Sequence, residues 1–159
     1  MDDIRGEIES AESLGDYEAV DVLWVAFLKI ANNLDGRGEK ERMTALVNKI
    51  PSRDLEVILN SKAVNFLLDL DPPLESVLAN SHEQLQRDAS IKAIAAVRKT
   101  RNSDSRNAML SLGEILKRIR NKRAHGFKSA KGDRDREILG ATRIALLELC
   151  NAALRSHQI

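Results

Sequence analysis

Apolar side chains recur along most of this chain at the spacing of an amphipathic helix. The clearest stripe lies between Gly15 and Asn32, where apolar residues fall at positions i, i+3, i+4, i+7, i+8 and i+11. Its members are Val20, Leu23, Trp24, Phe27, Leu28 and Ala31. We predict a helix here that is capped by Asp16 and buries this stripe in the core.

The first half of the chain is expected to contain shorter helices as well. The pattern predicts a weakly apolar helix over residues 2–13 and a stronger one over 39–50. Ser52 and Ser61 are expected to cap two short helices, because a serine hydroxyl can accept a bond from a free N–H group of the first turn. The stretch 51–80 is therefore predicted to hold a series of short helices.

Three longer helices are predicted in the second half. Residues 81–84 have the form of a capping box that opens a helix ending near Thr100. A second helix restarts at Ser105 or Asn107 and is expected to end at Gly126, and Asp133 is expected to cap the last one. The inward residues of the second helix follow steps of three, four and three: Met109, Leu112, Leu116 and Ile119.

These elements predict an all-α bundle of four to five principal helices, with short helices inserted in 51–80. The 159 residues are enough for one domain spanning 1–159. Only three prolines and 3% aromatic residues occur, which favours long helices over sheet. We find no apolar run long enough to span a bilayer, and the acidic start is unlike a secretory signal, so a cytoplasmic location with no membrane contact is expected.

Metal and cofactor chemistry receive little support from the sequence. The single cysteine, Cys150, excludes an internal disulfide, and Cys150 with His157 makes only two of the ligands that a zinc site needs. Asp133 and Asp135 lie where acids commonly stabilise a helix start. No Gly-rich phosphate loop occurs, and we expect neither a metal nor a cofactor.

Charge is distributed unevenly along the chain. The net charge of the whole is +1, but residues 1–97 carry −8 and residues 98–136 carry +9. A concentrated basic segment of this kind indicates a polyanionic partner such as nucleic acid. The alternative is a solvated basic face that the acidic half of the fold balances.

One motif in the basic segment combines residues suited to phosphodiester chemistry. Arg120, Asn121 and His125 lie at the predicted end of a helix. Arginine offers a planar fork for phosphate, and histidine can move a proton near neutral pH. In a regular helix Arg120 and His125 point about 140° apart. They can meet within one chain only if the helix ends or distorts between them.

The motif and its setting resemble the HEPN family (higher eukaryotes and prokaryotes nucleotide-binding). The resemblance rests on Arg120, Asn121 and His125, at the end of one helix and before the final helix of a small all-α bundle. It covers roughly residues 81–157. It implies a metal-independent endoribonuclease whose motif lies in a cleft between two protomers, often a toxin paired with an antitoxin or part of a defence system.

From these residues we infer acid–base transesterification of RNA. The ribose 2′-hydroxyl would attack, His125 would move a proton, Arg120 would hold the phosphate, and Asn121 would orient His125 or contact phosphate. A homodimer would supply a second histidine. Cations expected to bind the RNA backbone are Lys117, Arg118, Lys122, Arg123, Lys128 and Lys131.

Two other classes of function remain open at this point. The first is a non-catalytic HEPN-like module that binds nucleic acid or a partner protein. The second is a regulator that reads duplex DNA with a basic helix, although no helix-turn-helix signature supports it.

Overall fold

Helices make up every regular element of the computed structural model, which describes residues 2–34, 36–70, 84–125 and 133–157. Within these ranges there are eight α-helices and one 3-10 turn, with no strand. The predicted all-α bundle is therefore confirmed. The four longest helices have 17 to 25 residues, in agreement with the four to five principal helices expected. No helix among the described residues combines the length and hydropathy needed to cross a membrane.

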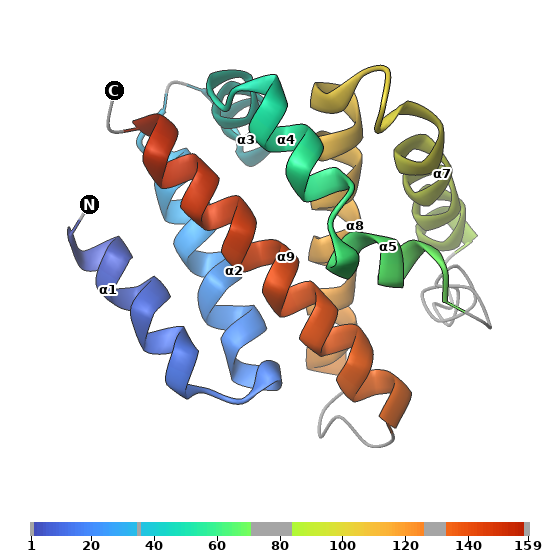
Figure 1. Cartoon of the computed structure of the whole chain (residues 1–159), viewed down its shortest axis with the longest axis horizontal. Coiled ribbons are helices and arrows are strands. Elements are labelled where there is room, and N and C mark those ends of the chain that lie inside the picture. The colour runs from blue at the N-terminus through green and yellow to red at the C-terminus, as the bar shows by residue number, and fades with distance from the viewer. Residues whose placement is uncertain (1, 35, 71–83, 126–132, 158–159) are drawn as a thin grey trace.

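The core lies where three long helices meet. Helix α9 (Asp133–His157) crosses the front of the bundle in Figure 1, and α2 (Asp16–Asn32) and α8 (Ser105–His125) lie behind it. Their predicted apolar stripes face one another, because each can leave water only against a neighbour. Fully buried members include Leu23, Phe27, Leu112, Leu116, Ile119, Leu146 and Leu149.

Helix α1 (Asp2–Ser10) and the 3-10 turn η1 (Ala11–Ser13) pack against α2. Arg143 of α9 joins this end of the chain to the core through four acceptors. Its guanidinium donates to the carbonyls of Ala11, Glu12 and Leu14 at 2.8, 3.2 and 2.8 Å, and to Asp16 Oδ1 at 3.0 Å. This arginine thus adds a charged donor to three carbonyl groups at the turn, one of which, that of Ala11, also accepts the N–H of Leu14.

Two predicted helix caps are wrong by one residue. Gly15, not Asp16, is the N-cap of α2, because the Asp16 carboxylate bonds Arg143 instead. Pro51, not Ser52, is the N-cap of α4, and its carbonyl accepts the N–H groups of Asp54 and Leu55. The Ser61 cap is confirmed by a bond from Val64 N at 3.3 Å.

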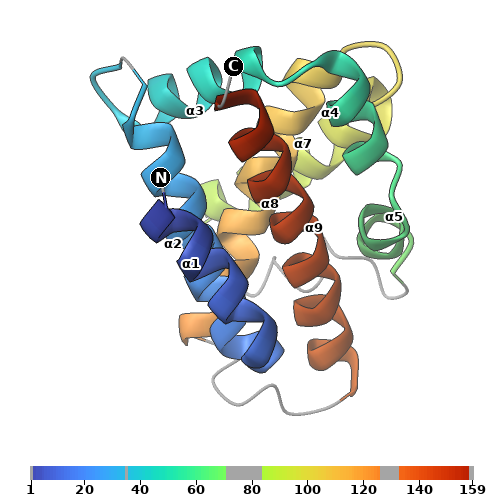
Figure 2. The same ribbon diagram turned by 60° about the vertical axis from the view of Figure 1, so that its left-hand side comes forward.

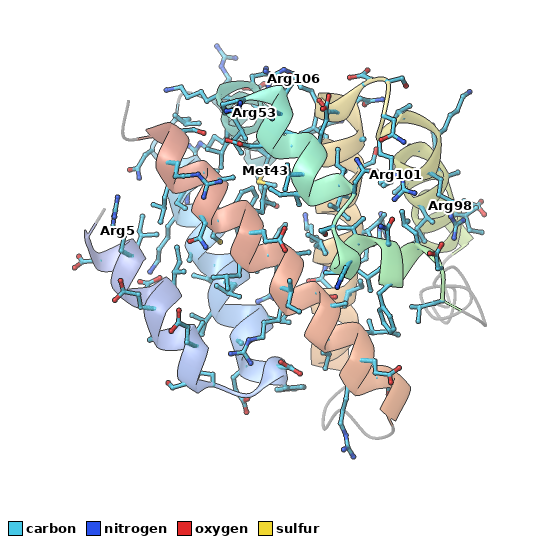
Figure 3. The ribbon with its side chains drawn as sticks, viewed as in Figure 1. Arg5, Met43, Arg53, Arg98, Arg101 and Arg106 are labelled. Carbon is cyan, nitrogen blue, oxygen red and sulfur yellow. The ribbon has the colours of Figure 1, made fainter. Side chains whose placement is uncertain are left out.

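Three short helices follow α2: α3 (Glu39–Lys49), α4 (Ser52–Leu59) and α5 (Lys62–Leu68). Short helices within 51–80 are thus confirmed for the described part of that stretch. Arginines from much later in the chain donate to carbonyl groups at the C-terminal ends of all three helices, and Figure 3 labels these three arginines. Arg106 donates to the carbonyls of Val47 and Ile50 at 2.7 and 3.1 Å, Arg101 to that of Leu59 at 3.4 Å, and Arg98 to that of Leu68 at 2.7 Å.

Helix α7 (Gln84–Thr100) packs along α8, on the side of the bundle opposite α1 (Figures 1 and 2). The predicted interruption near residues 101–104 is present, and Asp104 Oδ1 accepts the N–H of Asn107 at 3.2 Å to start α8. Residues 81–83 of the predicted capping box and Gly126, the predicted helix terminator, lie outside the described residues.

Candidate functional site

The candidate site lies toward the C-terminal end of α8. The helix is held in place by its buried stripe, since Met109, Leu112, Leu116 and Ile119 are at most 1% exposed. Arg120 directly follows the last of these residues and sits at the margin of the stripe, with 31% of its side chain exposed. A guanidinium at such a margin needs a partner, because desolvating an unpaired charge is costly.

The partner of Arg120 is Asp21, from the middle of α2. Arg120 Nε and Nη2 lie 2.9 and 2.8 Å from the same Asp21 Oδ1. Arg120 Nη1 also donates to Asn121 Oδ1 at 3.3 Å. The structure thus brings Arg120 and Asn121 together and adds an acid that the motif does not contain. We refer to Asp21, Arg120 and Asn121 as the arginine cluster.

Sequence reasoning missed Asp21, although the sequence carries a signal. Asp21 stands between Val20 and Val22 in the most apolar helix of the chain. An acid in that setting usually has a cationic partner. The identity of the partner could not be read from the sequence, because Arg120 lies 99 residues away.

His125 is the last residue of α8, and the backbone from Arg120 to His125 is helical. The helix therefore neither ends nor distorts between these two residues, and their positions stand about 140° apart around its axis. Arg120 and His125 were expected to meet within one chain only if the helix ended or distorted between them, and this backbone does neither. Position 125 falls instead on the face of Arg118, seven residues before it and about 20° away.

The side chains of Lys122, Arg123 and His125 lie outside the described residues, although their backbone belongs to α8. Lys128 and Lys131 lie outside them altogether. The structure thus gives the contacts of four of the nine candidate site residues: Lys117, Arg118, Arg120 and Asn121.

Lys117 and Arg118 both take part in ion pairs. Lys117 Nζ lies 3.2 Å from Glu39 Oε1 of α3, and Arg118 Nη2 lies 3.8 Å from Glu114 Oε2 one turn earlier on α8. All four side chains are at least partly exposed, so these pairs are weak and open to competition from another anion.

The same four residues line a groove of about 690 Å³ between α3, α7 and α8. Trp24 of α2 is part of its lining, as is Met43 of α3, labelled in Figure 3. The groove is partly open to solvent and adjoins the arginine cluster, because Lys117 and Arg118 stand directly before Ile119 and Arg120 on α8.

Part of the basic segment has a structural task. Arg98, Arg101 and Arg106 donate to the carbonyl groups of α3, α4 and α5 described above, and Arg120 pairs with Asp21. The net charge of residues 98–136 therefore overstates the positive charge that this segment can offer to a polyanion. The described cations that remain closest to the arginine cluster are Lys117 and Arg118.

Among the described residues, no group of three or more His, Cys, Asp or Glu side chains is arranged to hold a metal ion. Cys150 is a buried core residue whose Sγ donates to the Leu23 carbonyl at 3.4 Å. Burial raises the pKa of its thiol to about 12, so the side chain stays protonated at neutral pH.

Comparison of the chain with protein-family models, with curated proteins and with solved structures finds no match. The chemistry of the site therefore has to be argued from its own residues.

Proposed function

We propose that this protein is a metal-independent endoribonuclease that cleaves RNA. In the proposed reaction the ribose 2′-oxygen forms a bond to phosphorus and the bond to the 5′-oxygen breaks. The products are a 2′,3′-cyclic phosphate and a free 5′-hydroxyl. One His125 takes the proton from the 2′-hydroxyl, the His125 of a partner chain gives a proton to the leaving 5′-oxygen, and Arg120 stabilises the charge that develops on the phosphate oxygens.

The arginine cluster is the observation that carries this proposal. The guanidinium of Arg120 is partly exposed and has a fixed orientation, since one carboxylate oxygen accepts from both Nε and Nη2. A guanidinium has five N–H groups, and the contacts with Asp21 and Asn121 use three of them. Two N–H groups remain to meet a phosphate, in an orientation that is set before the substrate binds.

A homodimer is part of the proposal, for a geometric reason. Positions 120 and 125 lie about 140° apart around the helical backbone, which favours a site that a second chain completes. A two-fold axis near the end of α8 would place His125 of one chain opposite Arg120 of the other and would supply two histidines for the two proton transfers. A toxin role with a cognate antitoxin is consistent with this activity.

The runner-up is a HEPN-like module that binds RNA or a partner protein without cutting. The pairing of Arg120 with Asp21 favours it, because the same ion pair also joins α2 to α8, a structural role that requires no chemistry. In that case the groove and its cations would bind RNA while His125 had no role.

Cleavage of a fluorescently labelled single-stranded RNA in EDTA tests the proposal. The wild type should yield fragments with a cyclic phosphate end, and a 2′-deoxy nucleotide at the cut site should block that cut. His125→Ala and Arg120→Ala should each lower the rate at least 100-fold, the usual scale for a lost acid–base group. Arg53→Ala, at an exposed position on α4, is the matched control and should cut like the wild type.

Circular dichroism should show the same helical signal for all of these variants. Cleavage that survives both substitutions would place the chemistry elsewhere, and cleavage that stops in EDTA would overturn the metal-free mechanism. RNA binding by a wild type that never cuts would favour the runner-up, whereas tighter binding of duplex DNA than of RNA would favour a DNA regulator.

A further inference from the structure

The groove between α3, α7 and α8 is a second feature of the site that the proposed reaction does not yet use. Its volume of about 690 Å³ lies within the range of sites that hold small molecules. Its lining is of two kinds. Met43, Ala93, Ala96 and Leu110 provide an apolar surface together with Trp24, which is 3% exposed, and charged side chains provide the rim.

The rim carries more positive than negative charge. Its cations are Lys40, Lys92, Lys117 and Arg118, and its acids are Glu39 and Glu114. Both acids are already paired with rim cations. An occupant with an apolar, flat part and an attached anionic group would match both kinds of lining, and a nucleotide with its base and phosphate has this composition.

The groove and the arginine cluster are about one helical turn apart, both along α2 and along α8. Trp24 follows Asp21 by three residues on α2, and Lys117 precedes Arg120 by three residues on α8. Because Asp21 contacts Arg120 while Trp24 and Lys117 both line the groove, the two sites are neighbours along the α2–α8 contact. One turn advances about 5.4 Å, which a single nucleotide can bridge.

We propose that this groove binds the base of a nucleotide adjacent to the phosphate held by Arg120. This inference rests on the proposed ribonuclease function and specifies its substrate as single-stranded RNA. A base that is paired within a duplex cannot turn away from its partner to enter the groove without the cost of unstacking. Rim lysines would contact the backbone on either side and contribute salt-dependent affinity.

The single tryptophan of the chain provides a direct readout, since Trp24 lines the groove. We would titrate inactive His125→Ala protein with a six-nucleotide single-stranded RNA and follow the Trp24 emission. A saturable change is expected with this RNA. The same RNA annealed into a duplex, and inorganic phosphate, should give no saturable change, and the duplex also controls for absorption by the bases.

Filling the groove should weaken this binding. Ala93→Leu adds volume to the groove from α7, whereas Ala95→Leu makes the same change at an exposed position of the same helix. We expect Ala93→Leu to raise the Kd at least tenfold and Ala95→Leu to leave it unchanged. Ser111→Leu fills the groove from α8 and should reproduce the effect of Ala93→Leu. The second variant allows the test to be made even if one of the two folds poorly.

Cleavage by the same variants in an active background separates the two proposals. If the wild type cuts RNA and both groove-filling variants bind and cut like Ala95→Leu, the groove proposal is overturned and the ribonuclease stands. If the emission titration behaves as expected but the wild type never cuts, the ribonuclease is overturned and the nucleotide groove stands. If the groove-filling variants bind RNA normally but lose binding to a protein, the groove binds a protein segment and the proposal is overturned.

Discussion

Asp21 and Arg120 meet across the contact between α2 and α8, with Nε and Nη2 of the arginine 2.9 and 2.8 Å from one oxygen of the acid. The relationship has two opposite effects on the proposed reaction. The acid fixes the direction of the guanidinium, which favours the transition state. It also places a negative charge close to the phosphate position, which weakens ground-state binding of RNA.

Asp21→Asn should therefore lower kcat and KM together. The amide removes the negative charge, so RNA should bind a few fold more tightly, while a less firmly oriented Arg120 should slow the chemical step. The free energy of unfolding should fall by no more than about 1 kcal/mol, since both side chains are partly exposed. Steady-state cleavage and urea unfolding measure these effects.

Asp16→Asn is the control for that substitution. Asp16 lies on the same helix and also pairs with an arginine, Arg143, but at the end of the bundle near the 3-10 turn. It should cost a similar amount of stability and leave kcat and KM unchanged. If Asp21→Asn behaves the same way, the Asp21–Arg120 pair has a structural role only.

Mixing two inactive variants tests the shared cleft. His125→Ala and Arg120→Ala should each be inactive alone, and a mixture of the two should recover a fraction of wild-type activity, because each mixed dimer keeps one intact His125 facing one intact Arg120. Subunit exchange should first be established by sedimentation over a concentration series. A protein that remains monomeric at concentrations where it is fully active would contradict the dimer.

Neutralising Lys122, Lys128 and Lys131 together should weaken binding of all RNA sequences alike. Each phosphate contact on a single strand contributes about 0.7 to the slope of log K against log salt concentration, so the loss of three contacts should reduce that slope by about 2. Fluorescence anisotropy at several salt concentrations measures it. A loss confined to one RNA sequence, at an unchanged slope, would contradict this role.

Arg106→Ala should lower the free energy of unfolding by about 1–3 kcal/mol. The substitution leaves the carbonyls of Val47 and Ile50 without the charged donor that now satisfies them. Arg53→Ala removes an exposed arginine and should change stability by less than about 0.5 kcal/mol. Urea unfolding at one temperature compares the two variants. Equal unfolding midpoints would show that water replaces Arg106 as the donor to these carbonyl groups.

Glu148→Gln should stabilise the protein at pH 7 and have little effect at pH 4. Burial raises the pKa of Glu148 above its ordinary value of 4.5, so the native state holds this proton more firmly than the unfolded chain does. Native stability consequently falls as the pH rises through the raised pKa, and the glutamine removes this loss. Glu137→Gln, at an exposed position on the same helix, is the control for the loss of one negative charge.

The sequence correctly predicts those features of the fold, such as buried helix faces, that depend only on residues close together in one helix. The stripe that contains Met109 and Ile119 recurs every three or four residues, and it correctly places α8 and its buried face. The cap at Ser61 needs only the N–H of Val64, three residues away, and it is confirmed. Asp16 was expected to cap α2 by the same local rule and does not, because an arginine 127 residues away takes its carboxylate.

The candidate site is only partly accessible to such reasoning. Arg120 stood out because it occurs with Asn121 and His125 at a predicted helix end in a basic segment, but its partner Asp21 could not be identified until the α2–α8 contact was known. The groove combines side chains from four helices, and no local pattern connects Trp24 with Lys92 or Lys117. His125 was placed correctly near a helix end, and the geometry of its side chain stays a prediction.

The arginines that bond the ends of α3, α4 and α5 also govern how the chain can acquire its structure. Arg98, Arg101 and Arg106 stand 30 to 59 residues after the carbonyl groups they satisfy. During synthesis the three short helices are made before the side chains that complete them. The C-terminal ends of α3, α4 and α5 therefore lack these donors until α7 and the start of α8 have been made, and we expect these helix ends to become fully stable only after that point.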